Sequence, residues 1–305
     1  MSQAPPRLFD RALHRRRLDR AARAAGAADF LRVRAAGDLV ERLETIMRSF
    51  SLAVELGARG GELKRALAGS PAGGRIGILV EADLSLAQLR GRPGPRLVLD
   101  EERLPFAPES LDLALSTLAL HWTNDLPGVL AQVRRALKPD GLFLAAILGG
   151  ATLTELRWAL TQAEVEVTGG AGPRVSPFAG AYDGASLLQR AGFALPVADT
   201  DVVTVRYESP LMLLRDLRAM GETNVLVDRP ARPLGPAVLA RAFDLYVERF
   251  AGPDGRVPAT FEIITLTGWA PHESQQKPLA PGSAKARLAE VLGTREIGTG
   301  EKPGG

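Results

Sequence analysis

The stretch that decides the fold is residues 52–61, Leu52-Ala53-Val54-Glu55-Leu56-Gly57-Ala58-Arg59-Gly60-Gly61. An apolar run ends beside an acid, Glu55, and opens into a turn that is rich in glycine. Because glycine lacks a Cβ and tolerates positive φ, a nucleoside cofactor can approach the backbone of such a turn closely. Turns of the kind Glu-x-Gly-x-Gly-x-Gly have their middle glycine where this chain has Arg59. The side chain at 59 either intrudes on a cofactor or points away in a turn reshaped by Gly60.

Similar apolar runs recur along the chain and predict a parallel sheet. Buried strands are expected at residues 51–56, 76–80, 96–99, 111–116 and 142–148. Helical stretches separate most of them, and the clearest has an apolar stripe from Leu126 to Leu137. Residues 139–141, Pro-Asp-Gly, are expected to end that helix. This alternation implies right-handed crossovers and a doubly wound α/β sheet.

After Gly149 the pattern changes to longer helices with two strands among them. Helices are expected over 152–167, 183–192, 211–220 and 238–250, and strands over 197–207 and 259–269. We expect the two strands to close the sheet edge and the helices to form an inserted lid. The predicted division is a basic helical segment at 1–48, a Rossmann-like core at 49–150, the lid with the closing strands at 151–274, and a polar, partly mobile tail at 275–305.

The composition of the chain excludes some kinds of functional site and some classes of protein. With 305 residues, 46% of them hydrophobic and 24% charged, the chain can bury a large globular core. It has no cysteine, which excludes disulfides and thiolate chemistry, and its three scattered histidines argue against a zinc site. No metal ligands are predicted. No run of about 18 apolar residues exists, so no membrane-spanning segment is expected. The net charge of +3 weakly favours an acidic partner and does not argue for nucleic acid.

The N-terminal segment is basic and helical in pattern. Arg7, Arg11 and Arg15 recur at i,i+4 spacing. A solvated basic face is the plain interpretation, and contact with an acidic partner or a membrane surface is the alternative. A transit peptide is a third interpretation, against which Asp10 and Asp19 count.

Acids follow the first three predicted strands, at the edge where open parallel sheets bind ligands. Glu55 and the glycine turn follow the first strand. Asp83 follows the second, about 20–25 residues beyond the glycines, where a carboxylate accepts hydrogen bonds from ribose hydroxyls. Asp100 and Glu101 follow the third, where an acid can accept from an adenine amino group. The order of these acids favours a nucleoside cofactor over coincidence.

Further residues near these strand ends complete the predicted site. Leu84 and Leu104 would sandwich an adenine ring. The fourth strand ends in Ser116, followed by His121 and Trp122. Each element has a structural alternative: Asp83 can cap a helix, His121 can be a hydrogen-bonded structural histidine, and Trp122 can be a core or lid residue.

At these residues the chain resembles class I S-adenosylmethionine-dependent methyltransferases of the type 11 group, and within it the complex I assembly factor 5 family of mitochondria and alphaproteobacteria. Residues 99–143 are also similar to malonyl-carrier-protein O-methyltransferases. The segments typical of the assembly-factor branch are Leu8-Phe9-Asp10-Arg11, 149–157 (GGATLTELR), 176–178 (SPF), 220–224 (MGETN), 268–275 (GWAPHESQ) and 282–284 (GSA).

The resemblance implies a Rossmann-like, seven-stranded fold that binds S-adenosylmethionine. The cofactor contacts then expected are Glu55, Gly57, Ala58, Gly61, Asp83, Leu84, Asp100, Glu101 and Ser116. Glu55 and Gly57 would line the methionine and ribose portion, and Asp83 would hold the ribose. His121 is the best available general base.

Three functions follow from the resemblance and the residues. The first is methyl transfer to a small-molecule or protein acceptor. The second is an assembly role on a respiratory complex I subunit, with hydroxylation of an arginine. The third is a non-catalytic scaffold with a degenerate cofactor site, for which Glu155, Arg157 and Glu222 would form a docking surface. The expected location is the cytoplasm of a bacterium or the mitochondrial matrix of a eukaryote.

Overall fold

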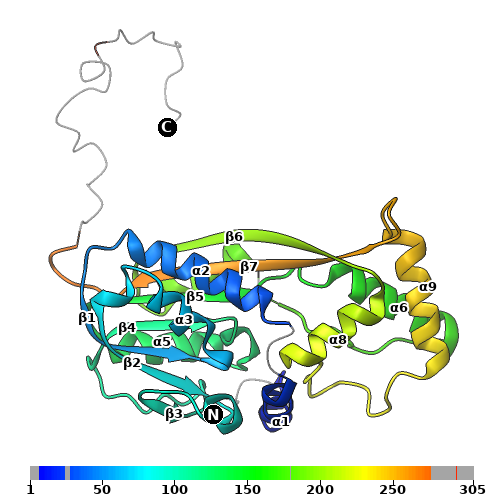
Figure 1. Ribbon diagram of the computed structural model, residues 1–305, viewed down its shortest axis with the longest axis horizontal. Coiled ribbons are helices and arrows are strands. Elements are labelled where there is room, and N and C mark those ends of the chain that lie inside the picture. Colours follow the sequence, from blue (N-terminus) through cyan, green and yellow to red (C-terminus); the bar gives the residue numbers. More distant parts are fainter. Residues whose placement is uncertain (1–6, 25–27, 179, 276–292, 294–305) are drawn as a thin grey trace, which may run out of the picture. The chain divides into compact units, whose positions relative to one another are not determined.

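Seven strands form one sheet in the order β3-β2-β1-β4-β5-β7-β6 (Figure 1). The computed structural model describes residues 7–24, 28–178, 180–275 and 293, and it divides the chain into a unit of residues 1–271 and a unit of residues 272–305. The strands belong to the first unit and are β1 Phe50–Leu56, β2 Ile76–Asp83, β3 Arg96–Val98, β4 Leu111–Thr117, β5 Leu137–Leu148, β6 Ala194–Tyr207 and β7 Val257–Trp269. The expected seven-stranded sheet, closed by the last two strands, is confirmed.

Strands β1 to β5 are parallel, β7 is antiparallel to β5, and β6 is antiparallel to β7. From β1 the strand order runs through β2 and β3 on one side and through β4 and β5 on the other. This reversal puts the switch point between the carboxyl ends of β1 and β4, where ligands bind in sheets of this kind. The predicted division at residues 1–48, 49–150, 151–274 and 275–305 stays a prediction, and residues 282–284 and most of the tail lie outside the described residues.

Helices cover both faces of the sheet. They are α1 Arg11–Ala21, α2 Phe30–Glu44, α3 Glu62–Ala68, α4 Leu86–Leu89, α5 Leu126–Ala136, α6 Thr154–Thr168, α7 Ala181–Arg190, α8 Pro210–Met220 and α9 Pro236–Phe250. On one face of the sheet, helices α2, α3, α6, α8 and α9 pack in a core with side chains such as Leu113 and Leu144. On the other face, α5 and α7 pack in a second core with Phe143. Successive strand residues point to opposite faces, so each buried strand serves both cores.

The prediction that residues 139–141 end the helix before β5 is wrong. Helix α5 ends at Ala136, and Leu137 already pairs with Leu111 in the sheet. The register then shifts before Leu142 pairs with Leu113, and Asp140 takes a left-handed φ of 62°. The Pro-Asp-Gly sequence therefore forms an irregularity inside β5 and does not separate the helix from the strand.

The lid and α1 meet at the carboxyl ends of the strands. Strands β6 and β7 extend beyond the rest of the sheet to α6, α8 and α9 (Figure 1). The residues before α1 pair with the loop after α8, because Phe9 bridges Leu226 and the Asp10 N–H donates to the Val225 carbonyl at 2.8 Å. Helix α1 thus lies across the edge of the sheet where the predicted site lies.

Candidate functional site

In the glycine turn, the backbone of Gly57 lies in close contact with neighbouring segments. The backbone N–H groups of Gly57 and Ala58 both donate to the Ala82 carbonyl, at 2.8 and 2.9 Å. Gly57 has a φ of 75°, and a Cβ there would lie 2.1 Å from the Cβ of Ala119. Only glycine fits this position. On Gly61 a Cβ would lie 2.3 Å from Arg92 Nη2, so Arg92 covers this predicted cofactor contact.

Arg59 points inward. Gly57, Gly60 and Gly61 take left-handed φ angles of 75°, 61° and 82°, so the middle glycine of the turn is Gly60, one residue later than in the usual pattern. Arg59 is only 4% exposed, and its guanidinium forms an ion pair with Glu222 on the lid. Its Nη2 lies 3.3 Å from the His14 Nε2 of α1. Whether this buried side chain intrudes on a cofactor or leaves room for it stays a prediction.

Arg32 of α2 fastens the turn to the end of β4. Its Nη1 donates to the Thr117 carbonyl at 2.6 Å, and its Nη2 donates to the carbonyls of Gly57 and Arg59 at 3.0 and 3.2 Å. Its Nε lies 3.2 Å from Glu62. Sequence reasoning missed this residue. The available signal was an arginine inside the apolar pattern of α2, because a buried arginine requires partners.

The two strand-end acids of β1 and β2 are buried. Burial raises the pKa of Glu55 to about 7, and burial together with the charge of Glu101 raises the pKa of Asp83 to about 6. Asp83 Oδ1 accepts from the Ser85 N–H at 2.7 Å. Asp83 Oδ2 and Glu55 Oε2 are buried without a hydrogen-bond partner among the described residues. Such orphaned oxygens are typical of a polar ligand site.

The acids after β3 are paired with α1. Arg11 Nη2 donates to Asp100 Oδ1 at 2.7 Å and also forms an ion pair with Glu101. The Arg11 side chain is 12% exposed, so the interpretation of this helix face as solvated is wrong for Arg11. The cause is the pair of carboxylates beneath the helix, which compensates its desolvation.

The remaining predicted contacts lie in the same region. Ser116 is buried, and its hydroxyl donates to the Leu56 carbonyl at 2.8 Å. Leu84 and Leu104 are each 9% exposed. The contacts of these residues and of Ala58 with a cofactor stay predictions.

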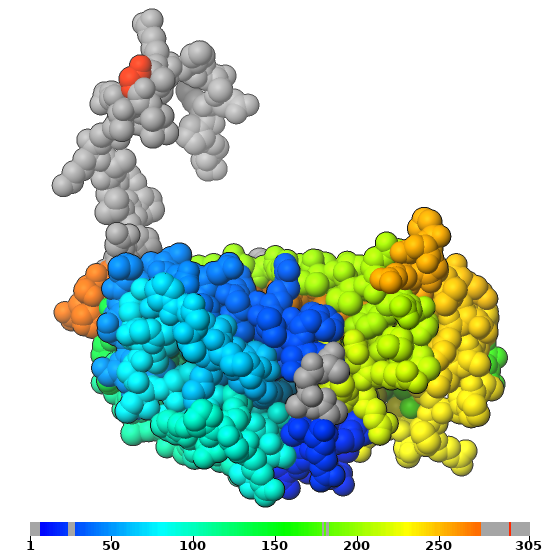
Figure 2. Space-filling view, viewed as in Figure 1, coloured from blue at the N-terminus to red at the C-terminus, as the bar shows by residue number. Residues whose placement is uncertain are grey.

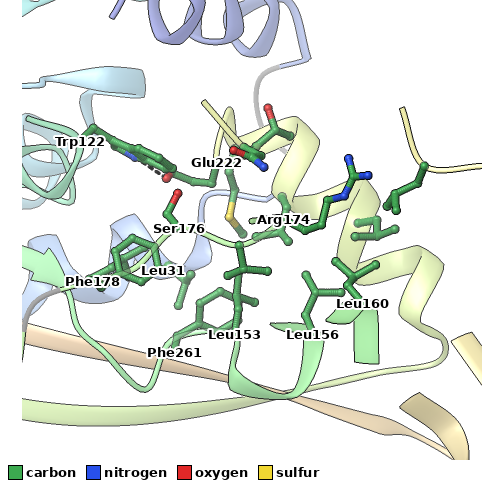
Figure 3. Close-up of a pocket in the computed structure, with 18 residues that line it drawn as sticks. Leu31, Trp122, Leu153, Leu156, Leu160, Arg174, Ser176, Phe178, Glu222 and Phe261 are labelled. Atoms are coloured by element: carbon green, nitrogen blue, oxygen red, sulfur yellow. Dashed lines mark hydrogen bonds between the residues drawn. The ribbon is translucent and has the colours of Figure 1, made fainter. Parts of the chain in front are cut away.

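A cavity of about 270 Å³ lies on the lid side of this region (Figure 3). Its wall is mostly apolar, with Leu153, Leu156 and Leu160 of the α6 region at one end and Trp122, Ser176 and Glu222 at the other (Figure 3). The Ser176 and Thr223 hydroxyls are buried without a hydrogen-bond partner in the described structure. The cavity is therefore a leucine-lined space with one polar end.

Three segments that the sequence marks as typical of its branch meet at this cavity. They are residues 149–157, 176–178 and 220–224, named here the lid segments, and each contributes residues to the wall. Arg157 Nη2 donates to the Ser176 carbonyl at 3.1 Å, and Asn224 Nδ2 donates to the Pro173 carbonyl at 2.8 Å. Three of the six segments that are typical of the branch therefore contribute to one cavity.

Glu222 joins the cavity to the glycine turn. Its Oε2 accepts from Trp122 Nε1 at 2.6 Å, and its other oxygen holds Arg59. Burial acts to raise the pKa of Glu222, but the Arg59 charge and His121 outweigh it and hold the pKa well below its usual range. Glu155 is also buried and accepts from Thr260. The prediction that Glu155, Arg157 and Glu222 form a docking surface is therefore wrong for Glu155 and stays a prediction for the other two.

His121 lies beside this carboxylate. Its Nε2 is 3.5 Å from Glu222 Oε2, and its Nδ1 is 3.4 Å from the Leu148 N–H. Burial lowers the pKa of His121, which keeps the imidazole neutral. Its role as a general base stays a prediction. Trp122 is 2% exposed, which confirms it as a core and lid residue.

In the protein without added ligand, Glu55 and Asp83 are expected to lower the free energy of unfolding as the pH rises through the window from about 4 to about 7, while the lowered pKa values of His14 and His121 act in the opposite direction. The pKa of Glu55 rises from 4.5 to about 7 on folding, and that of Asp83 from 3.8 to about 6. Between these values the two carboxyl groups bind more protons in the folded state than in the unfolded chain, so their contribution to the free energy of unfolding falls with pH. Urea unfolding at a series of pH values should show a shallower fall for Glu55→Gln and the wild-type slope for Asp201→Asn, whose side chain is 51% exposed. Equal slopes for wild type and Glu55→Gln would contradict the assignment.

Comparisons with known proteins agree on the fold. The family described as "Methyltransferase domain" matches residues 54–145. A candidate methyltransferase of Bacillus halodurans has a solved structure that covers 77% of this chain and 99% of its own, with a TM-score of 0.53 and 16% identity. The expected class I methyltransferase fold is confirmed.

Two curated relatives extend over nearly the whole chain. The mitochondrial arginine-hydroxylase NDUFAF5 of Danio rerio is 38% identical over 291 residues, which are 93% of this chain and 89% of the relative. The malonyl-[acyl-carrier protein] O-methyltransferase of Halorhodospira halophila is 34% identical over 97% of this chain and 99% of its own. The protein therefore belongs to the arginine-hydroxylase NDUFAF5 family of methyltransferase-fold proteins.

Proposed function

We propose that this protein binds S-adenosylmethionine at the carboxyl ends of β1 to β4. The observation that carries the proposal is Asp83, a buried carboxylate at the end of β2 with one oxygen left for a ligand. It lies behind the glycine turn, where Gly57 cannot be replaced by a residue with a side chain. Donors on a ribose would satisfy the Asp83 oxygen, and Glu55 offers a second orphaned oxygen. The residues present fit the group.

Each part of the site would hold a different part of the cofactor. Glu55 and Gly57 would line the methionine and ribose portion, and Asp83 would hold the ribose hydroxyls. Asp100 and Glu101, now joined by Arg11, would flank the adenine. When bound, the sulfonium supplies an activated methyl group, so that orientation is the main task of the protein.

Asp83→Ala is expected to weaken S-adenosylmethionine binding by about 1–3 kcal/mol, through the loss of charge-assisted hydrogen bonds to the ribose. Calorimetry with S-adenosylmethionine and with its demethylated product measures the effect. Asp201→Ala, on the exposed edge strand β6, is the matched control and should bind as wild type. An unchanged affinity in Asp83→Ala would mean that the ribose contact is misassigned. If the wild type binds neither compound at millimolar concentration, the scaffold function remains.

For the reaction we propose modification of an arginine side chain of a protein. The relatives of this chain are named arginine-hydroxylases. Glu222, at the junction between the turn and the cavity, already binds a guanidinium, that of Arg59. A substrate arginine could place its methylenes along the leucines of the cavity and its guanidinium on this carboxylate. The resemblance makes a respiratory complex I subunit the partner to test.

A second candidate reaction is methyl transfer, because a relative named as an O-methyltransferase matches 97% of the chain. Within the described ranges, no group of three or more His, Asp or Glu side chains is placed to hold a metal ion. Mass spectrometry of respiratory-complex subunits from a deletion strain and from a complemented strain separates the reactions. An added oxygen supports hydroxylation, an added methyl supports transfer, and normal complex I assembly in the deletion strain would count against the assembly role.

The location that we propose follows the arginine-hydroxylase relatives, which are named mitochondrial. For a eukaryotic chain we propose the mitochondrial matrix, and for a bacterial chain the cytoplasm. In the described part of the chain, no helix has both the length and the apolar character needed to cross a bilayer.

A further inference from the structure

Arginines of α1 and α8 gather on one outer face of the first unit. Arg16, Arg17 and Arg20 lie on α1, and Arg218 lies in the last turn of α8. The two helices approach closely where α8 ends, because a Cβ on Gly221 would lie 3.2 Å from Ala21 and 3.3 Å from Leu18. Figure 2 shows α1, in dark blue, at the surface of the first unit. We name Arg16, Arg17, Arg20 and Arg218 the arginine cluster.

Among the residues that the structure describes, the arginine cluster has no carboxylate partner. Its four side chains make no ion pair within the described residues, whereas Arg11 and Arg59 on the inner side of this region are both paired. Arg17 Nε, Arg20 Nε and Arg20 Nη2 are shielded from solvent and lack an acceptor in the described structure. Burial and the charge of Arg218 lower the pKa of Arg17, and burial together with the charge of Arg17 lowers the pKa of Arg20. The cluster is a set of repelling cations with unused donors.

We infer that the arginine cluster is a docking surface for an acidic segment of a protein partner. Guanidinium forks match carboxylates in two-point contacts, and several such contacts would relieve the mutual repulsion. A membrane surface fits less well, because α1 buries Leu18 and Ala21, and its exposed apolar residue, Ala12, is too small to anchor a helix in a bilayer. Nucleic acid fits less well because the net charge of the whole chain is only +3.

The cluster lies on the far side of the helix that covers the candidate site. The inner side of α1 supplies Arg11 to Asp100 and His14 to Arg59. A partner bound to the outer side would therefore hold α1 in place over the site. This role deepens the proposed function and rests on it, because the bound partner would be the protein that carries the target arginine.

The test uses the full-length protein and a fluorescently labelled hexaglutamate peptide, with hexaglutamine as the uncharged control. Fluorescence anisotropy is measured at about 150 mM salt, where long-range attraction is screened. The cluster variant is Arg17→Gln/Arg20→Gln/Arg218→Gln. The matched control is Arg103→Gln/Arg135→Gln/Arg190→Gln, three exposed arginines elsewhere that remove the same charge. Thermal unfolding and S-adenosylmethionine binding are measured for every variant.

The expected result is saturable hexaglutamate binding that falls about tenfold or more in the cluster variant and less than about twofold in the control. The cluster variant should unfold no earlier than wild type, because it removes repelling charges. Absence of peptide binding, or equal losses in both variants, would overturn the inference. Cluster-dependent binding to phosphatidylserine vesicles without peptide binding would overturn it in favour of a membrane. If S-adenosylmethionine does not bind while the peptide binds through the cluster, the proposed function fails and the docking surface stands.

Discussion

Replacing Arg32 by methionine is expected to lower the free energy of unfolding by about 3–5 kcal/mol and to abolish S-adenosylmethionine binding. Arg32 donates to the carbonyls of Gly57, Arg59 and Thr117, so one side chain joins the glycine turn to the end of β4. It is also paired with Glu62, which is 3% exposed. Methionine would fill similar space but leave three carbonyls and a buried carboxylate without this donor.

Arg34→Met is the matched control for this prediction. Arg34 lies on the same helix and pairs with Asp201, but both side chains are more than half exposed. A surface pair of this kind contributes about 0–1 kcal/mol. Denaturant unfolding of both variants and calorimetry with S-adenosylmethionine make the comparison. If Arg32→Met is as stable as Arg34→Met and still binds the cofactor, the turn does not depend on this arginine.

The sheet could be predicted from the chain because its information is local. Each buried strand is a continuous apolar run, such as residues 51–56, and the helices between the strands fix their parallel order. The acids at the strand ends follow from the same pattern, since a parallel sheet brings those ends together. The error at residues 139–141 has a local cause as well. Pro-Asp-Gly ends helices, and here the same conformational preferences serve an irregularity in a strand.

The ionic contacts of the site could not be predicted because their partners are far apart in sequence. Arg11 and Glu101 are 90 residues apart, and Arg59 and Glu222 are 163 residues apart. No periodicity records which acid an arginine will meet, since the meeting depends on how α1 and the lid pack on the sheet. From the sequence, Arg59 is therefore only a departure from the pattern Glu-x-Gly-x-Gly-x-Gly. In the fold it forms the charged link between the turn and the lid.

Breaking the ion pair between Arg59 and Glu222 is the second change expected to lower the free energy of unfolding strongly. Glu222→Gln would leave the Arg59 charge, 4% exposed, without its ion-pair partner and beside a neutral amide, which should cost about 3–5 kcal/mol of unfolding free energy. Arg59→Met would leave the Glu222 carboxylate without its arginine partner, beside Trp122 and His121. The double variant should recover part of the loss, with a coupling energy of about 0.5–3 kcal/mol. Additive losses in the double-mutant cycle would show that the two side chains do not interact.

The same variants test whether Glu222 recognises a guanidinium from outside. In Arg59→Met the carboxylate lacks its internal partner, while the cavity beside it is lined by leucines. Millimolar n-propylguanidine should therefore raise the melting temperature of Arg59→Met, because a ligand that binds only the folded state stabilises it by mass action. It should not raise that of Arg59→Met/Glu222→Gln, which has no carboxylate to bind. n-Propylamine is the control for charge alone, since it lacks the planar fork that binds a carboxylate at two points. Equal stabilisation of both variants, or of Arg59→Met by both compounds, would exclude Glu222 as the arginine-binding residue.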